Sequence, residues 1–141
     1  MPVLGLDIGT QTVGVAASDP LGYTAQPVET IRYDTPPEAY HRLYFLLRER
    51  EIDHIVAGLP LNMNGSEGAQ ALKVREFLKN FKAYLTRKNF SVTIELRDER
   101  LSTRAAERTL LEADLSRAKR KKVIDKMAAV FILQGYLDSK I

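Results

Sequence analysis

Apolar positions along this 141-residue chain follow two different periods, which predicts strands and helices in alternation. Five segments are continuously apolar or alternate with period two, and they are short enough to be strands. The predicted strands are residues 3–8, 12–18, 23–33, 55–59 and 92–96. Because only short connections separate the first three, they favour an antiparallel meander.

Four further segments repeat their apolar residues at spacings of three and four, or are apolar on all sides, and these are predicted helices. They are residues 36–51, a long helix from about 66, a helix capped by Ser102 or Thr103 and ending near 112, and residues 121–138. Thr35, Pro36 and Glu38 form a capping box at the start of the first. The middle of the last helix has no polar face, which predicts a buried helix.

This order of elements predicts an α/β fold, in which helices flank a mixed five-stranded sheet made of the antiparallel meander and parallel strands. The length and the 45% hydrophobic composition are those of one globular domain, expected to cover residues 1–141. The sequence contains no linker or repeat that would divide it.

The chain has no cysteine, which excludes disulfides, thiolate metal sites and a cysteine nucleophile. Asp7 interrupts the apolar start where a signal peptide would continue, and no apolar run is long enough to span a bilayer. We therefore expect a cytoplasmic protein without a membrane partner.

Charge is distributed unevenly between the two halves of the chain. Residues 1–68 carry four basic and nine acidic side chains, whereas residues 69–141 carry seventeen basic and nine acidic ones. The strongest basic run comprises Arg117, Lys119, Arg120, Lys121, Lys122 and Lys126, and a second group comprises Arg97, Arg100, Arg104 and Arg108. Such an asymmetry is typical of a domain that binds a polyanion, although a charge run can also be a solvated surface.

Three acidic positions are candidates for chemistry. Asp7 lies in the first strand between Gly5 and Gly9, which leave room for a ligand, although it could instead hydrogen-bond the following turn. The Asp98 and Glu99 pair ends a predicted strand, where ligands collect in α/β sheets, although it could also form surface ion pairs.

Asp125 is the third candidate, on one stripe of the last helix with Ala129, Ile132 and Tyr136. A buried carboxylate needs a cation or hydrogen bonds, and Lys121 or Lys122 could supply a structural ion pair instead.

If the three acidic positions converge, the cluster suits Mg²⁺ or Mn²⁺ and hydrolysis of a phosphodiester by a two-metal mechanism. Asn62, Gly65 and Ser66 lie in a loop between a strand and a helix, where backbone N–H groups can bind a phosphate. His41 and His54 show no metal-ligand spacing, so surface or structural roles are expected.

Four separated motifs resemble the YqgF family, described as nucleases of pre-16S ribosomal RNA and also as Holliday junction resolvases. They are residues 4–10 with 13–16, residues 58–62 with 65–68, residues 98–103, and residues 124–125 with 128–129. The resemblance covers nearly the whole chain and implies a ribonuclease H-like fold related to the junction resolvase RuvC. It also implies a two-metal site with Asp7, the Asp98 and Glu99 pair, and Asp125 as ligands. It does not decide between Asp98 and Glu99, and Asp98 is favoured because it is nearer the predicted strand end.

The leading hypothesis is a Mg²⁺- or Mn²⁺-dependent nuclease acting on structured RNA, with the end of pre-16S ribosomal RNA, and so ribosomal precursor particles, as its target. Arg100, Arg104, Lys119, Arg120, Lys121 and Lys122 are the residues expected to position phosphates. The alternatives are a resolvase acting on branched DNA and a non-catalytic RNA-binding assembly factor. The sequence does not decide between a monomer and a homodimer.

Overall fold

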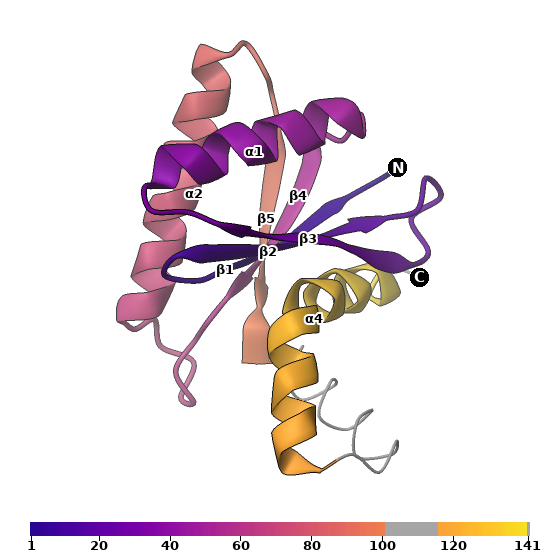
Figure 1. The fold of residues 1–141 in the computed structure, drawn as a ribbon, viewed down its shortest axis with the longest axis vertical. Coiled ribbons are helices and arrows are strands. Elements are labelled where there is room, and N and C mark those ends of the chain that lie inside the picture. The colour runs from indigo at the N-terminus through magenta and orange to yellow at the C-terminus, as the bar shows by residue number, and fades with distance from the viewer. Residues whose placement is uncertain (101–115, 141) are drawn as a thin grey trace.

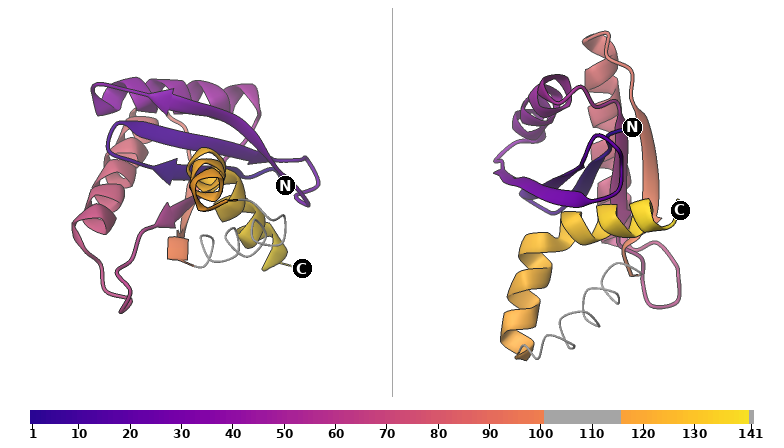
Figure 2. Two further views of the ribbon diagram at one scale, coloured as in Figure 1. Left: turned by 60° about the horizontal axis from the view of Figure 1, so that its bottom comes forward. Right: turned by 90° about the vertical axis from the view of Figure 1, so that its right-hand side faces the viewer.

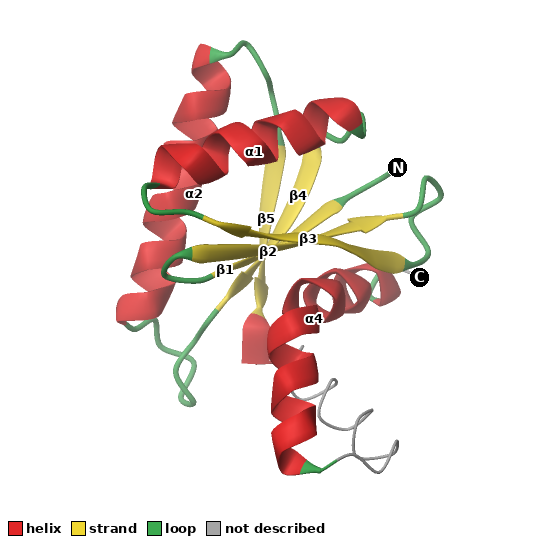
Figure 3. Cartoon of the chain, viewed as in Figure 1, coloured by secondary structure: helices red, strands yellow, loops and turns green. Residues whose placement is uncertain are grey.

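The computed structural model describes residues 1–100 and 116–140. The strands are β1 (Leu4–Ile8), β2 (Thr12–Ser18), β3 (Ala25–Arg32), β4 (His54–Leu59) and β5 (Thr93–Asp98). The helices are α1 (Pro36–Glu49), α2 (Ala69–Arg87) and α4 (Arg117–Asp138). Figure 1 shows their arrangement, and Figure 3 separates the strands from the helices around them.

The five strands form one mixed sheet in the order β3-β2-β1-β4-β5. β2 pairs antiparallel with β1 and with β3, while β4 pairs parallel with β1 and with β5. The predicted α/β fold and the mixed five-stranded sheet are therefore confirmed. Because β1, β4 and β5 are parallel neighbours, their carboxyl ends lie at one edge of the sheet.

Helices cover both faces of the sheet. α1 and α2 pack on the face that carries Leu4, Leu6 and Ile8, where the ring of Tyr40 stacks on Phe81 with centroids 5.6 Å apart. α4 packs on the opposite face, where Ala129, Ile132, Leu133 and Leu137 join Val3 and Val56 in a second, smaller apolar cluster. Figure 2 shows these layers from the side.

Helix α4 bends, so that one part lies across the sheet and the other extends away from it (Figure 2). Over residues 127–138 only one face is buried, and Val130 and Phe131 are half-buried among the described residues. The prediction that the helix is buried on all sides is therefore wrong for these residues, because a helix lying on a sheet can bury only the stripe that faces it. No helix in the described ranges is long and apolar enough to cross a membrane.

Three elements begin two or more residues away from the predicted position. β3 begins at Ala25 because the carboxylate of Asp19 accepts hydrogen bonds from the N–H groups of residues 21, 23 and 24, which folds them into a turn. α2 begins at Ala69, after the loop that follows β4. α4 begins at Arg117, where the Ser116 hydroxyl caps it by accepting from Lys119 N. The helix predicted over residues 102–112 lies outside the described residues.

Gly5 lets α4 approach the sheet. A Cβ at this position would lie 2.7 Å from Leu133 Cβ and 3.1 Å from the carbonyl oxygen of Ala129, whereas a Cβ at Gly14 would meet only ordinary contacts of 3.6 Å and more.

We therefore expect Gly5→Ala to lower the free energy of unfolding by about 1–3 kcal/mol through overpacking, and Gly14→Ala to change it little. Urea unfolding of both variants measures this, and equal effects would contradict the close packing of α4.

Candidate active site

Asp7 lies near the carboxyl end of β1, on the face that α4 covers. Side chains alternate along a strand, so Leu6 and Ile8 point to the core beneath α1 and α2 while Gly5 and Asp7 point to α4. A Cβ built on Gly14, which pairs with Asp7 across β1 and β2, would lie 3.6 Å from Asp7 Cβ and 3.7 Å from Ala129 Cβ. The Asp7 carboxyl group therefore lies beside α4, and the neighbouring residues Gly14 and Ala129 have no large side chains.

Glu99, the residue after β5, reaches this same place. Its carboxyl group is hydrogen-bonded to that of Asp7, although β4 lies between β1 and β5 in the sheet. Glu99 crosses above Gly58 of β4, where a Cβ would lie 3.5 Å from Glu99 Cδ. β4 separates β1 from β5, and neighbouring strands are about 4.8 Å apart, so a side chain as long as that of glutamate is suited to span this distance. Gly58 leaves room for it and for Ile132 of α4, whose Cδ1 would lie 2.6 Å from a Cβ at this position.

The two carboxyl groups share a proton. Burial raises the pKa of Glu99 to about 8, and the hydrogen bond to Asp7 and the negative charge of Asp7 act in the same direction. Near neutral pH, Glu99 therefore donates a hydrogen bond to the Asp7 carboxylate. Two oxygen-bearing groups held this close, with one surplus proton, are a donor set suited to a divalent cation.

Asp98 lies on the other face of β5 and is bound to Arg100. Arg100 Nη2 lies 2.7 Å from Asp98 Oδ2, and Arg100 Nε and its backbone N also donate to the Asp98 carboxylate. This contact raises the pKa of Arg100 above its ordinary value. The two adjacent acids thus have separate surroundings, because side chains alternate along the strand.

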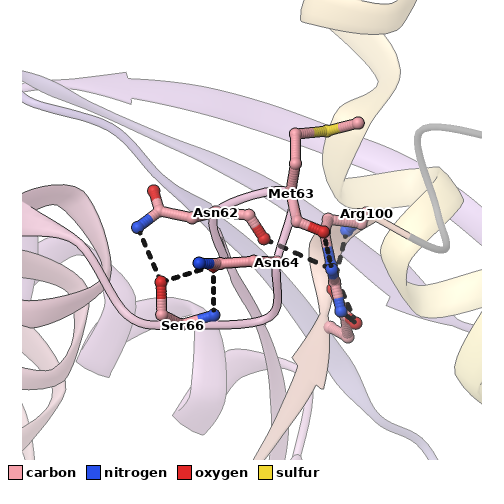
Figure 4. Close-up of polar contacts among 6 residues, drawn as sticks. Asn62, Met63, Asn64, Ser66 and Arg100 are labelled. Carbon is pink, nitrogen blue, oxygen red and sulfur yellow. Dashed lines mark hydrogen bonds and ion pairs between the residues drawn. The ribbon is translucent and has the colours of Figure 1, made fainter.

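Arg100 also holds the loop that follows β4. Its Nη1 donates to the carbonyl oxygens of Asn62 and Met63, at 3.2 and 3.0 Å (Figure 4). The loop is closed on itself by the bridge between Leu61 and Glu67. Arg100 therefore connects the end of β5 to the loop after β4, beside the Asp7 and Glu99 pair.

The polar groups of this loop bond mainly to one another. Ser66 N and Ser66 Oγ donate to Asn64 Oδ1, Gly65 N donates to Asn62 O, and Asn62 N donates to Ser66 O. Gly65 has φ +87°, a conformation that favours glycine. The N–H groups of Asn62, Gly65 and Ser66 are thus already used, so a phosphate would meet the loop through other groups. Met63 is 86% exposed.

Comparison with known proteins identifies the family. Residues 1–139 match the family described as "RuvX: Holliday junction resolvase". The chain belongs to this family. Proteins named "Putative pre-16S rRNA nuclease" from Desulforamulus reducens and from Clostridium botulinum strain Hall are each 52% identical to it, over 99% of this chain and 98% of theirs.

Solved structures place this RuvX family member in the RuvC-like, ribonuclease H-like fold. The Thermus thermophilus RuvC structure matches with a TM-score of 0.61 and 14% identity, over 99% of this chain and 96% of that one. A fowlpox virus resolvase in complex with Holliday junction DNA matches with a TM-score of 0.53 and 13% identity, over 100% of this chain and 99% of that one. At these identities the likeness concerns the fold alone.

The remaining predicted site residues of this RuvX family chain are described only in part. Asp125 belongs to α4, one helical turn before Ala129, which lies beside Asp7. The side chains of residues 120–126, and all of Arg104, lie outside what the structure describes. Lys119 is exposed in the first turn of α4. Within the described residues, no three His, Cys, Asp or Glu side chains form a metal-binding group.

The raised pKa of Glu99 gives the stability of the metal-free protein a pH dependence. Glu99 holds its proton more tightly in the folded protein than in the unfolded chain, so stability falls as the pH rises from about 5 to about 8. We expect Glu99→Gln to remove this part of the pH dependence. Urea unfolding in EDTA at several pH values in this range measures it.

Glu49→Gln, which changes an exposed glutamate at the end of α1, serves as the control and should keep the wild-type pH dependence. If Glu99→Gln and the wild type lose the same stability over this range, the two carboxyl groups do not share a proton.

Proposed function

We propose that this chain is a divalent-metal-dependent nuclease that hydrolyses phosphodiester bonds in structured RNA, with the end of pre-16S ribosomal RNA as its substrate. The observation that carries the proposal is the contact between Asp7 and Glu99 at the carboxyl edge of β1, β4 and β5. Membership of the RuvX family and the names of its relatives support it. Such a nuclease would act in the cytoplasm, where ribosomal RNA is processed.

Asp7 and Glu99 are the residues that we expect to hold Mg²⁺ or Mn²⁺. Their oxygen atoms are the ligands these ions prefer, and a cation would take the place of the shared proton. Asp125, one turn before Ala129 in α4, is proposed as the third carboxylate. When bound, a divalent ion polarises the phosphodiester and stabilises the negative charge that develops on the leaving oxygen.

The reaction is hydrolysis. A water molecule gives up a proton as its oxygen bonds to phosphorus, the bond from phosphorus to one sugar oxygen breaks, and the leaving oxygen takes up a proton. Asp7 and Glu99 fix where this occurs, because β1, β4 and β5 hold them rigidly at one edge of the sheet. Two ions at this site would give the two-metal mechanism, which needs more ligands than the two described acids.

We assign Glu99 rather than Asp98 to the metal, and Asp98 to a positioning role. Asp98 is engaged by Arg100, and through Arg100 it holds the loop of Asn62 and Met63. Because the Arg100 guanidinium is used in these contacts, its main contribution is to place that loop beside the cleavage site.

Removal of either contacting carboxylate should abolish cleavage. We expect Asp7→Asn and Glu99→Gln each to reduce cleavage of a labelled pre-16S RNA end fragment by about a hundred-fold or more in Mg²⁺ or Mn²⁺, since the cation loses a charged ligand. Asp98→Asn should retain more activity than either, because it weakens the contact with Arg100 and leaves the Asp7 and Glu99 pair in place. EDTA should stop cleavage by the wild type.

Circular dichroism and RNA binding without metal serve as controls for each variant, and both should stay close to wild type. Loss of cleavage in Asp98→Asn together with full activity in Glu99→Gln would contradict the assignment of the ligand.

The basic run at the start of α4 is proposed to bind phosphates. Replacing Lys119, Arg120, Lys121 and Lys122 together by Ala should weaken RNA binding and lower the salt-dependence slope by up to about four, or about one for each phosphate that the variant no longer binds. Filter binding at several salt concentrations measures the slope. An unchanged slope would exclude this run from the RNA-binding surface.

A resolvase acting on branched DNA is the second candidate, because the family description names Holliday junction resolvase. The same preparations, given a four-way DNA junction and the RNA fragment in parallel, separate the two. Cleavage of the junction alone would favour the resolvase, and binding of RNA without cleavage of either would favour a non-catalytic assembly factor.

A further inference from the structure

Arg97 is a basic residue on the face of β5 that carries Glu99. Alternation along β5 places Glu95, Arg97 and Glu99 on the side of α4, with Arg97 paired in register with Gly58. Its guanidinium lies against Gly135 of α4, where a Cβ would be 3.1 Å from Arg97 Nη2 and 3.2 Å from Nε. A glycine in this turn of α4 therefore makes room for the guanidinium.

The side chain of Arg97 forms no hydrogen bond or ion pair with the described part of the protein, although its backbone belongs to the ladder between β4 and β5. Its Nε is buried and has no hydrogen-bond acceptor there. A buried N–H group without an acceptor destabilises the folded protein, and no contact of Nε in the described structure offsets this. Arg97 as a whole is only half-buried, so part of its side chain remains accessible to a ligand.

The two acids nearest along the strand face are both engaged elsewhere. Glu95 accepts from Tyr136 Oη at 2.6 Å and lies 2.5 Å from His54 Nε2, and these contacts lower its pKa. Glu99 contacts Asp7. Neither carboxylate therefore neutralises Arg97, whose charge has no partner among the described residues and lies two positions from Glu99.

We propose that Arg97 binds a phosphate of the substrate strand, next to the phosphate that is cleaved. A guanidinium presents a planar fork of donors that matches two phosphate oxygens. Residues two apart on a strand are about 7 Å apart, a separation comparable to that of neighbouring phosphates along one nucleic-acid strand. This inference rests on the proposed nuclease function and assigns Arg97 to substrate binding, not to the chemical step.

The test combines a protein change with a phosphate change. Binding is measured in EDTA, with RNA duplexes that model the pre-16S end and carry a single uncharged methylphosphonate at one linkage at a time. For the wild type, one methylphosphonate beside the cleaved linkage should weaken binding about ten-fold. Arg97→Gln should weaken binding of the unmodified RNA about ten-fold and lower the salt-dependence slope by about one, and this methylphosphonate should then cost nothing further.

Two further variants control for folding and for net charge. Gly135→Ala keeps the net charge and raises the helix propensity of α4, but its methyl group would displace the Arg97 guanidinium. This change should therefore weaken RNA binding when Arg97 is present. Added to Arg97→Gln, it should have no further effect. Arg87→Gln removes an exposed arginine in the last turn of α2, at the opposite edge of the sheet, and should keep the full sensitivity to the methylphosphonate.

The outcomes distinguish this inference from the proposed function. If the wild type binds and cleaves the RNA while Arg97→Gln keeps its affinity and its sensitivity to every methylphosphonate, the role of Arg97 is wrong and the nuclease assignment stands. If the wild type neither binds nor cleaves the RNA, the proposed function fails and the role of Arg97 fails with it.

Discussion

The contact between the carboxyl groups of Asp7 and Glu99 is the constraint on which the arrangement of this site depends. Two acids repel one another when both are ionised, and they stay together here because one of them keeps a proton. The sheet imposes the contact, since β1 and β5 flank β4 in parallel and end at the same edge. Gly58 on β4 carries no side chain and so leaves room for Glu99 and for Ile132 of α4. Such a pair lowers the stability of the metal-free protein at higher pH. It also provides oxygen ligands that attract a cation.

The surroundings of the pair are organised by the same alternation of side chains. On one face of β5, Asp98 holds Arg100, which fixes the loop after β4. On the other face, Glu95 is engaged by His54 and Tyr136, and Arg97 is left with unused donors next to the acids within the described structure. One short strand thus contributes a cation-binding group, a loop support and a phosphate-binding candidate, each set by its position in the strand.

Much of this could be predicted from the sequence. The alternation and spacing of apolar residues located the five strands and the helices α1 and α2, because their apolar patterns are strong. The capping box of Thr35 and Glu38 marked the start of α1. The boundary of β3 was missed because its cause is the hydrogen bonding of Asp19 to residues of a turn. All-round burial was wrongly expected for residues 127–138 of α4, because hydropathy does not show how many elements are available to cover a helix.

Of the predicted site residues, the structure brings Asp7 and Glu99 into contact, and the choice between the adjacent acids Asp98 and Glu99 as metal ligand stays a proposal. Asp98 was favoured for its nearness to the strand end, but that criterion ignores the face on which a side chain lies. Asp98 lies on the same face of β5 as Ile94 and Leu96, whereas Glu99 lies on the opposite face. The alternation of side chains along the strand already distinguishes the two acids in this way. The hydrogen bond from Glu99 to Asp7 could not be predicted, because it depends on the strand order and on the absence of a side chain at Gly58.

Direct measurement of Mn²⁺ binding by calorimetry tests the central claim, that Asp7 and Glu99 together hold the catalytic cation. The account predicts that the wild type and Asp98→Asn bind Mn²⁺ with similar affinity and that Asp7→Asn and Glu99→Gln each bind it much more weakly, with all four proteins folded. Undiminished binding by Glu99→Gln, with binding lost in Asp98→Asn, would contradict it.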